Sequence, residues 1–289
     1  MIPGAFEYHA AKSLDEAVAL LAAHNGDAKI LAGGHSLLPM MKLRFAEPAH
    51  LIDLNRVGEL KGIREDGAVI RIGAMTTEAE LMASPLLNAK LPLIVEAARQ
   101  IADPQVRNRG TIGGDAVHGD PGNDHPAVLM ALGASYVLRG PGGERTVAAD
   151  GFYLGTFMTQ MEPNEILREI TVPIPPPGSG HAYCKLKRKT GDYATAAAAV
   201  QLHLSGGVCR KVAITLTNVG PTPLNATQAA ALLSGKKIDD ALIGRAAEAA
   251  MAICDPAEDL RGDREYRTHM AGEMTRRAIR LAVSRAQGG

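Results

Sequence analysis

The chain has 289 residues, and its 31 lysine and arginine residues balance 31 aspartate and glutamate residues, so its formal net charge is zero. This balance argues against a nucleic-acid-binding protein that relies on an excess of positive charge. Aromatic residues make up 3% of the chain and tryptophan is missing, so stacking platforms for single-stranded nucleic acid are not expected either.

The cysteines and the apolar runs define the expected compartment. Cys184, Cys209 and Cys254 show no C-x-x-C spacing, so they form neither a four-thiolate iron–sulfur site nor a disulfide framework. No apolar run approaches the roughly 18 residues that a membrane-spanning helix needs, and the N-terminus lacks a signal-peptide pattern. We therefore expect a soluble, cytoplasmic protein without a transmembrane segment.

The N-terminal third begins with a well-marked helix. Ser13 and Glu16 form a capping-box pattern at its start, and Asn25-Gly26 supplies the stop. The pair Gly33-Gly34 follows an apolar stretch and precedes Ser36, which indicates a strand, a tight turn and a helical start. The elements expected here are a helix over 14–23, a strand over 30–32, a helical segment over 37–43 and a strand over 51–54.

The middle of the chain alternates hairpin and helix signals. Asp66-Gly67 is a strong hairpin signal, and Thr77 with Glu80 forms a second capping box. The segment 104–124 is rich in Gly, Asp and Asn, and we interpret it as a long functional loop between two helices. The elements expected here are strands over 60–63 and 68–72, helices over 91–102 and 126–132, a hairpin around 141–143 and a strand over 166–172.

A proline-rich segment over 173–178 is the clearest break in composition, because it can continue neither a helix nor a central strand. Beyond it, we expect a hairpin over 194–204 and 208–218, and then helices over 228–233, 240–253 and 266–286. The predicted fold class is α+β. We expect a domain over 1–177, divided into subdomains of about 1–55 and 56–177, and a smaller C-terminal domain over 178–289 with a small antiparallel sheet packed by helices.

Two glycine-rich turns, over 32–36 and 111–115, are the main candidates for ligand binding. Paired glycines let the backbone approach a ligand closely, and the amides that begin the following segment suit a diphosphate. Neither turn matches the G-x-G-x-x-G dinucleotide pattern or the phosphate-binding loop that ends in G-K-S/T. A Rossmann nucleotide domain and a P-loop enzyme are therefore both disfavoured.

The sequence around these turns resembles a known family. The motifs are AGGHSL at 32–37, DPQVRNRGTIGG at 103–114, YCKLKRK at 183–189, GDYA at 191–194 and YRTHMA at 266–271. Together they are similar to the flavin-binding subunits of molybdenum hydroxylases, and the similarity spans essentially the whole chain. The resemblance implies a two-part FAD-binding domain, noncovalently bound FAD, and a C-terminal domain that closes over the flavin.

The resemblance also implies a set of cofactor-binding residues. The two turns would hold the FAD diphosphate between them, with the Ser36 and Thr111 hydroxyl groups adding hydrogen bonds. Asp124 would bind a ribose, and Tyr193 would lie on the isoalloxazine face. Lys187 would lie near the flavin pyrimidine edge, where a cation stabilises reduced flavin. The full set is Ala32, Gly33, Gly34, His35, Ser36, Ile101, Thr111, Ile112, Gly113, Gly114, Asp115, Asp124, Leu167, Lys187 and Tyr193.

Asp115 departs from the family pattern, in which Asn is common at this position. An aspartate carboxylate cannot donate a hydrogen bond and would repel a phosphate, unless it is protonated or turned toward a backbone amide. A metal is not assigned, because the spacing of His118, Asp120, Asp124 and His125 matches no standard zinc pattern.

The resemblance implies partners as well as a cofactor. A small subunit would carry [2Fe-2S] clusters and a large subunit the molybdenum cofactor, in a dimer of heterotrimers that could associate with the inner membrane face. This chain would pass electrons to a quinone or another carrier and would supply no catalytic side chain. The alternatives are a flavin subunit for an N-heterocycle or aldehyde substrate, a stand-alone flavin oxidase, and a nucleotide-binding protein without redox chemistry.

Overall fold

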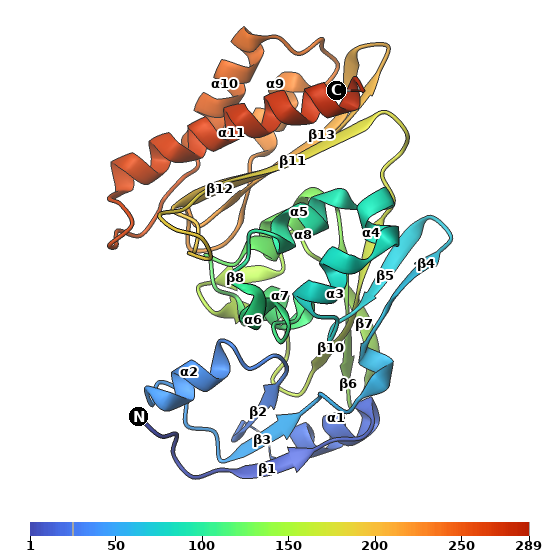
Figure 1. Cartoon of the computed structure of the whole chain (residues 1–289), viewed down its shortest axis with the longest axis vertical. Coiled ribbons are helices and arrows are strands. Elements are labelled where there is room, and N and C mark those ends of the chain that lie inside the picture. Colours follow the sequence, from blue (N-terminus) through green and yellow to red (C-terminus); the bar gives the residue numbers. More distant parts are fainter. Residues whose placement is uncertain (25, 289) are drawn as a thin grey trace.

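The computed structural model describes residues 1–24 and 26–288, and it has the α+β class that the sequence predicts. Over these residues, sheets of three, five and four strands follow one another along the long axis, together with a two-stranded ribbon (Figure 1). Asn25, one half of the predicted helix stop, lies outside the described residues.

The N-terminal layer is a parallel sheet in the order β1-β3-β2, with helix α1 packed against it (Figure 1). Its elements are β1 (Glu7–Ala10), α1 (Leu14–Ala23), β2 (Ala28–Leu31), α2 (Leu37–Lys42) and β3 (His50–Asp53). Helix α1 begins as predicted, because the Ser13 side chain accepts a hydrogen bond from the Glu16 amide. Strand β1 was not predicted, since its four residues show no apolar alternation.

The middle layer is a five-stranded sheet in the order β4-β5-β10-β6-β7. Its strands are β4 (Ile63–Asp66), β5 (Val69–Gly73), β6 (Ser135–Gly140), β7 (Gly143–Ala148) and β10 (Ile166–Pro173), and β8 (Tyr153–Gly155) pairs with β9 (Met158–Thr159) beside it. The hairpin at Asp66-Gly67 is confirmed. Its first strand was predicted too early, because Gly58–Leu60 form a turn of 3-10 helix, η1, that buries Leu60.

Short helices lie between the five-stranded sheet and the C-terminal sheet (Figure 1). They are α3 (Glu78–Ala83), α4 (Pro85–Lys90), α5 (Pro92–Ala98), α6 (Pro104–Arg107), α7 (Ile112–His118) and α8 (Asp124–Ala131). The capping box of Thr77 and Glu80 is present at the start of α3. Every residue of α8 is buried, because this helix packs between the two sheets.

The prediction of a long loop over 104–124 is wrong, because α6 and α7 fall within it. Each helix begins with a side chain that accepts a hydrogen bond from a backbone amide in its first turn. Asp103 accepts from Val106, and Thr111 accepts from Gly114. These local caps offset the low helix propensity of a segment rich in glycine and aspartate.

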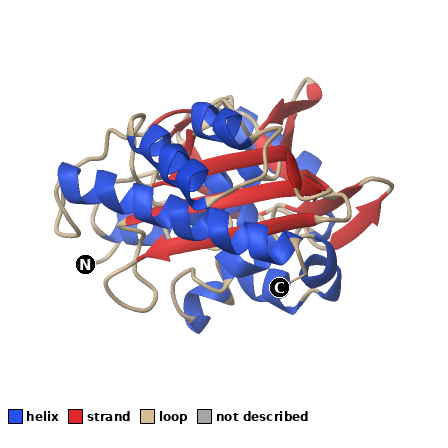
Figure 2. Cartoon of the chain, turned by 90° about the horizontal axis from the view of Figure 1, so that it is seen from above, coloured by secondary structure: helices blue, strands red, loops and turns tan. Residues whose placement is uncertain are grey.

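The C-terminal layer is an antiparallel sheet in the order β11-β12-β13-β14. Its elements are β11 (Ser179–Leu186), β12 (Ala196–Ser205), β13 (Val208–Thr217), β14 (Leu224–Asn225), α9 (Thr227–Leu233), α10 (Asp240–Met251) and α11 (Arg264–Ala286). Helix α11 runs along strands β11 and β12 on one face of the sheet (Figure 2). Ala197 faces the core of the middle layer and Ala198 faces these helices, which is why the alanine-rich strand β12 is buried on both faces. Among the described residues, no helix is long and apolar enough to cross a membrane.

Candidate cofactor site

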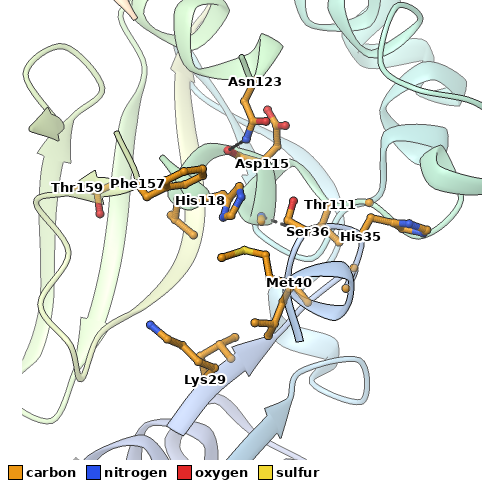
Figure 3. Close-up of a pocket in the computed structure, with 18 of the residues that line it drawn as sticks. Lys29, His35, Ser36, Met40, Thr111, Asp115, His118, Asn123, Phe157 and Thr159 are labelled. Atoms are coloured by element: carbon orange, nitrogen blue, oxygen red, sulfur yellow. Dashed lines mark hydrogen bonds between the residues drawn. The ribbon is translucent and has the colours of Figure 1, made fainter. Parts of the chain in front are cut away.

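A cavity of about 710 Å³ lies between the N-terminal layer, the middle layer and the start of the C-terminal domain. Figure 3 shows that β2, the two glycine turns and the ribbon near Phe157 surround it. Eleven of the predicted site residues line this cavity: Ala32, Gly33, Gly34, His35, Ser36, Ile101, Thr111, Gly114, Asp115, Asp124 and Tyr193. The cavity therefore brings together residues that are separated by up to 161 positions in the sequence.

The first glycine turn is in direct contact with the backbone that leads into the second. A side-chain carbon added at Gly33 would lie 2.3 Å from the carbonyl oxygen of Arg109 and 2.8 Å from the Cα of Gly110. Gly34 has a φ of +79°, a conformation that glycine adopts without steric cost. The absence of a Cβ at these two positions lets the first turn pack against the backbone that leads into the second turn.

The second turn opens α7, and the amides of residues 112–115 already donate hydrogen bonds within the protein. The Thr111 hydroxyl accepts a hydrogen bond from the Gly114 amide at 3.1 Å, and its own proton stays available for a ligand. Ser36 makes no capping hydrogen bond at the start of α2. The two hydroxyl groups and the backbone amides of the first turn thus form a polar rim suited to an anionic group.

Four predicted site residues do not line the cavity. Ile112 and Leu167 are buried in the core of the middle layer. Gly113 packs against Ala74, which directly follows strand β5, and an added Cβ would lie 2.6 Å from the Cβ of Ala74. Lys187 follows the end of β11, and burial together with the nearby Lys185 lowers its pKa.

Lys185, which the sequence analysis did not select, lines the cavity in an ion pair with Asp124. Its Nζ lies 2.7 Å from Asp124 Oδ2, and the two side chains are 2% and 6% exposed. The Tyr183 hydroxyl donates a hydrogen bond to the other carboxylate oxygen of Asp124. Strand alternation continued by one residue past β11 would put Lys187 on the same side as Tyr183 and Lys185, so the sequence pattern alone could not choose between the two lysines.

Asp115 is held by the backbone at the end of the cavity. Its Oδ2 accepts a hydrogen bond from the His125 amide at 3.2 Å, and the Asn123 side chain donates to its carbonyl oxygen at 2.8 Å (Figure 3). Its carboxylate is therefore turned toward a backbone amide, one of the two arrangements that relieve repulsion of a phosphate. Burial raises the pKa of Asp115 to about 7, with Glu78 and Asp124 adding to the rise and His125 opposing it.

A buried ion pair lies behind Asp115. His125 Nε2 is 2.7 Å from Glu78 Oε2, and the two side chains are 0% and 2% exposed. Burial alone would lower the pKa of His125, but the Glu78 carboxylate outweighs it, and the pKa rises to about 9. The charged imidazole thus balances carboxylates at the closed end of the cavity.

Tyr193 is positioned by its neighbour Asp192. The Asp192 carboxylate accepts a hydrogen bond from the Tyr193 amide and ion-pairs with Arg188 and Arg261. The Arg261 guanidinium also lies 5.7 Å from the centre of the Tyr193 ring. Tyr193 remains 45% exposed at the mouth of the cavity, so its ring is available to a ligand.

The acidic and histidine-rich segment after α7 does not gather as a metal site. Among the described residues, the set of His118, Asp120, Asp124 and His125 is not brought within a common ligand distance. The His118 ring instead packs against Phe157, with 5.0 Å between the ring centres (Figure 3).

Two family models together match nearly the whole chain. "FAD binding domain in molybdopterin dehydrogenase" matches residues 4–175, and "CO dehydrogenase flavoprotein C-terminal domain" matches residues 181–282. The chain therefore belongs to the FAD-binding subunits of the molybdenum hydroxylase family, a family of oxidoreductases. This finding confirms the resemblance that the glycine-turn motifs carry.

Individual relatives match the chain over nearly its whole length. It is 60% identical to the carbon monoxide dehydrogenase medium chain of Hydrogenophaga pseudoflava, over 99% of both chains. It is 55% identical to the medium chain of carbon monoxide dehydrogenase from Afipia carboxidovorans, over 99% of this chain and 100% of that protein. The solved structure of the Hydrogenophaga pseudoflava enzyme that lacks the Mo-pyranopterin moiety superposes with a TM-score of 0.98 at 61% identity, over 99% of each chain.

Proposed function

We propose that this chain is the FAD subunit of an aerobic carbon monoxide dehydrogenase. The observation that carries the proposal is the packing of the first glycine turn on the backbone that leads into the second, at one side of a cavity that Tyr193 and Lys185 reach from the C-terminal domain. The near full-length similarity to two carbon monoxide dehydrogenase medium chains supports the choice of substrate. When bound, FAD supplies the redox group that links iron–sulfur clusters on a partner to an external acceptor, a quinone or another carrier.

The cavity fits this cofactor in size and in chemistry. Ligand pockets commonly measure about 300–1,000 Å³, and this one measures about 710 Å³. The turn over 32–36 offers backbone amides for a diphosphate, and Ser36 and Thr111 offer hydroxyl groups. Asp124 has carboxylate oxygens for a ribose hydroxyl, and Ile101 offers an apolar contact.

The C-terminal residues complete the proposed site. We assign the Tyr193 ring to the isoalloxazine face and Lys187 to the pyrimidine edge. Lys187 is then a second cation near the flavin, in addition to Lys185. Leu167 acts through packing beneath the site, because it is buried in the core. The proposed domain boundary at 177/178 makes residues 178–289 a unit that closes over the flavin.

The proposed assembly contains two other kinds of subunit. The three cysteines of this chain lack the spacing of an iron–sulfur site, so a small subunit would carry the [2Fe-2S] clusters and a large subunit the molybdenum cofactor. We propose a dimer of heterotrimers in the cytoplasm, in contact with the inner membrane face through the complex.

The proposal is tested on the native assembly. The tagged chain is isolated from its host, and the flavin spectrum, the iron and molybdenum contents and carbon monoxide-dependent dye reduction are measured. We expect flavin, both metals and activity with carbon monoxide. Dye reduction with an N-heterocycle or an aldehyde instead would contradict the substrate, and a chain that carries flavin without metals would indicate a stand-alone oxidase.

Replacing Asp115 by asparagine is expected to remove a pH dependence of FAD binding. The wild-type carboxyl group is neutral below its pKa of about 7 and ionised above it, while His125 stays charged through this range because its pKa is about 9. Wild-type affinity should therefore fall as the pH rises through 7, and Asp115→Asn should bind about tenfold tighter at alkaline pH but equally at mildly acidic pH.

The measurement is a titration of the FAD-free chain with FAD across this pH range. Unchanged or weaker binding of Asp115→Asn on the alkaline side would show that repulsion between Asp115 and the phosphates is not a cost in this protein.

A further inference from the structure

Three histidines from separate elements meet at the edge of the N-terminal sheet. They are His9 on β1, His24 directly after α1, and His50 at the start of β3. One ring nitrogen from each histidine can be chosen so that the three nitrogens all lie within 4.8 Å of one another. Among the described residues, this is the one group of three or more histidine, cysteine or acidic side chains that comes so close together.

The strand register explains how the cluster arises. In the parallel pairing of β1 with β3, Glu7 lies opposite His50. His9 is two residues beyond Glu7, so all three side chains share one face of the sheet. Helix α1 covers the same face, and its end brings His24 onto His50, with the two rings stacked 3.5 Å apart.

The spacing of the nitrogen and oxygen atoms matches that around a tetrahedral metal ion. Zinc lies about 2.0–2.1 Å from a histidine nitrogen, so neighbouring ligand atoms in a tetrahedron are about 3.3 Å apart. His50 Nδ1 lies 3.1 Å from His9 Nε2 and 3.5 Å from Glu7 Oε2. A single ion can therefore contact His9 Nε2 and His50 Nδ1 together.

His24 supplies the third imidazole. It is partly buried, and it follows the last residue of α1, so its ring can rotate to direct a nitrogen at the shared point. Its present position stacks the ring on His50, which keeps it beside the other two ligands. Borderline nitrogen ligands of this kind suit divalent zinc, copper, nickel and cobalt rather than magnesium or calcium.

We propose that His9, His24 and His50 bind one divalent transition-metal ion of the zinc type, with the fourth position open to water. The ion would cross-link β1, β3 and the end of α1 and so stabilise the N-terminal sheet. Strand β2 of this sheet leads into the first glycine turn. The site is separate from the cofactor cavity, because none of the three histidines lines it. Its existence does not depend on flavin binding.

The test uses the full-length chain, purified without a histidine tag and treated with a chelator. Zinc is titrated in competition with a chromophoric chelator, and cobalt is titrated while its visible absorption is recorded. We expect one zinc ion per chain, and cobalt bands of the intensity that tetrahedral coordination gives. Zinc should also raise the thermal unfolding temperature, since a ligand that binds only the folded chain stabilises it.

The glutamine variants of each histidine identify the ligands. His9→Gln, His24→Gln and His50→Gln should each weaken zinc binding by at least about 100-fold, because loss of even an outer partner of a metal ligand costs 10–100-fold. His269→Gln is the matched control, since His269 lies on the surface of α11 with 64% of its side chain exposed. It should bind zinc as the wild type does.

Two outcomes would overturn the proposal. One is that the wild-type chain takes up no zinc saturably or gives an octahedral cobalt spectrum. This outcome is measured on the wild-type chain, so it does not depend on whether the variants fold. The other is wild-type zinc affinity in the three glutamine variants, which would leave the cluster as stacked and hydrogen-bonded imidazoles.

Discussion

Gly33→Ala is expected to weaken FAD binding strongly while the chain still folds. The new methyl carbon would lie 2.3 Å from the Arg109 carbonyl oxygen, a backbone atom that cannot move without shifting the second glycine turn. Separating the two turns would remove the cradle for the diphosphate. We expect FAD affinity to fall at least about 100-fold, the equivalent of ~2.7 kcal/mol, and stability to fall by about 1–3 kcal/mol.

The measurement pairs an FAD titration with denaturant unfolding of the FAD-free chain. Gly142→Ala is the matched control, because it lies in the exposed turn between β6 and β7 and an added Cβ there meets nothing within 4 Å. That variant should keep wild-type FAD affinity. Near-normal FAD binding by Gly33→Ala would contradict the role of the contact between the turns.

Lys185→Met is expected to give the largest loss of stability among single charge removals at the cavity. Methionine keeps the apolar part of the side chain but leaves the Asp124 carboxylate, 6% exposed, without its cation. Breaking a buried pair on one side commonly costs 3–5 kcal/mol, and because the Tyr183 hydroxyl still donates to Asp124 we expect about 3 kcal/mol. Adding Asp124→Asn to Lys185→Met should restore at least about 1 kcal/mol, because no uncompensated charge is then buried.

Urea unfolding of the FAD-free chain measures these changes. Lys90→Met is the matched control, since Lys90 and its partner Glu65 are 37% and 40% exposed and such a pair contributes about 1 kcal/mol or less. An equally small loss for Lys185→Met and Lys90→Met would show that the Asp124 pair is solvated rather than buried. A double variant less stable than Lys185→Met would contradict the charge argument.

The sequence predicted the parts of the fold that depend on local signals. Ser13 and Thr77 mark helix starts, and Asp66-Gly67 marks a hairpin, because each acts on residues within a few positions of itself. The two helices within 104–124 were missed because the prediction gave more weight to the Gly-, Asp- and Asn-rich composition of this segment than to the capping residues Asp103 and Thr111. Strand β1 was missed because it is stabilised by pairing with β3, 43 residues away in the register, rather than by its own pattern.

The candidate site also contains parts that the sequence could predict and parts that depend on contacts between distant residues. The two glycine turns are visible in the sequence, since close backbone approach demands glycine. Lys185 could not be separated from Lys187 by strand alternation, because the choice depends on Asp124, which lies on another element. The cluster of His9, His24 and His50 has no sequence spacing of a known metal motif, since the parallel sheet and the end of α1 bring its members together.

The most direct test of this account is an experimental structure of the native assembly with its flavin bound. We predict that the FAD diphosphate lies between the backbone amides of residues 33–36 and the Thr111 hydroxyl group that begins the second turn, with the Tyr193 ring against the isoalloxazine and Asp124 at a ribose. A flavin bound elsewhere, or an intact assembly whose cavity between the two turns holds no flavin, would contradict it.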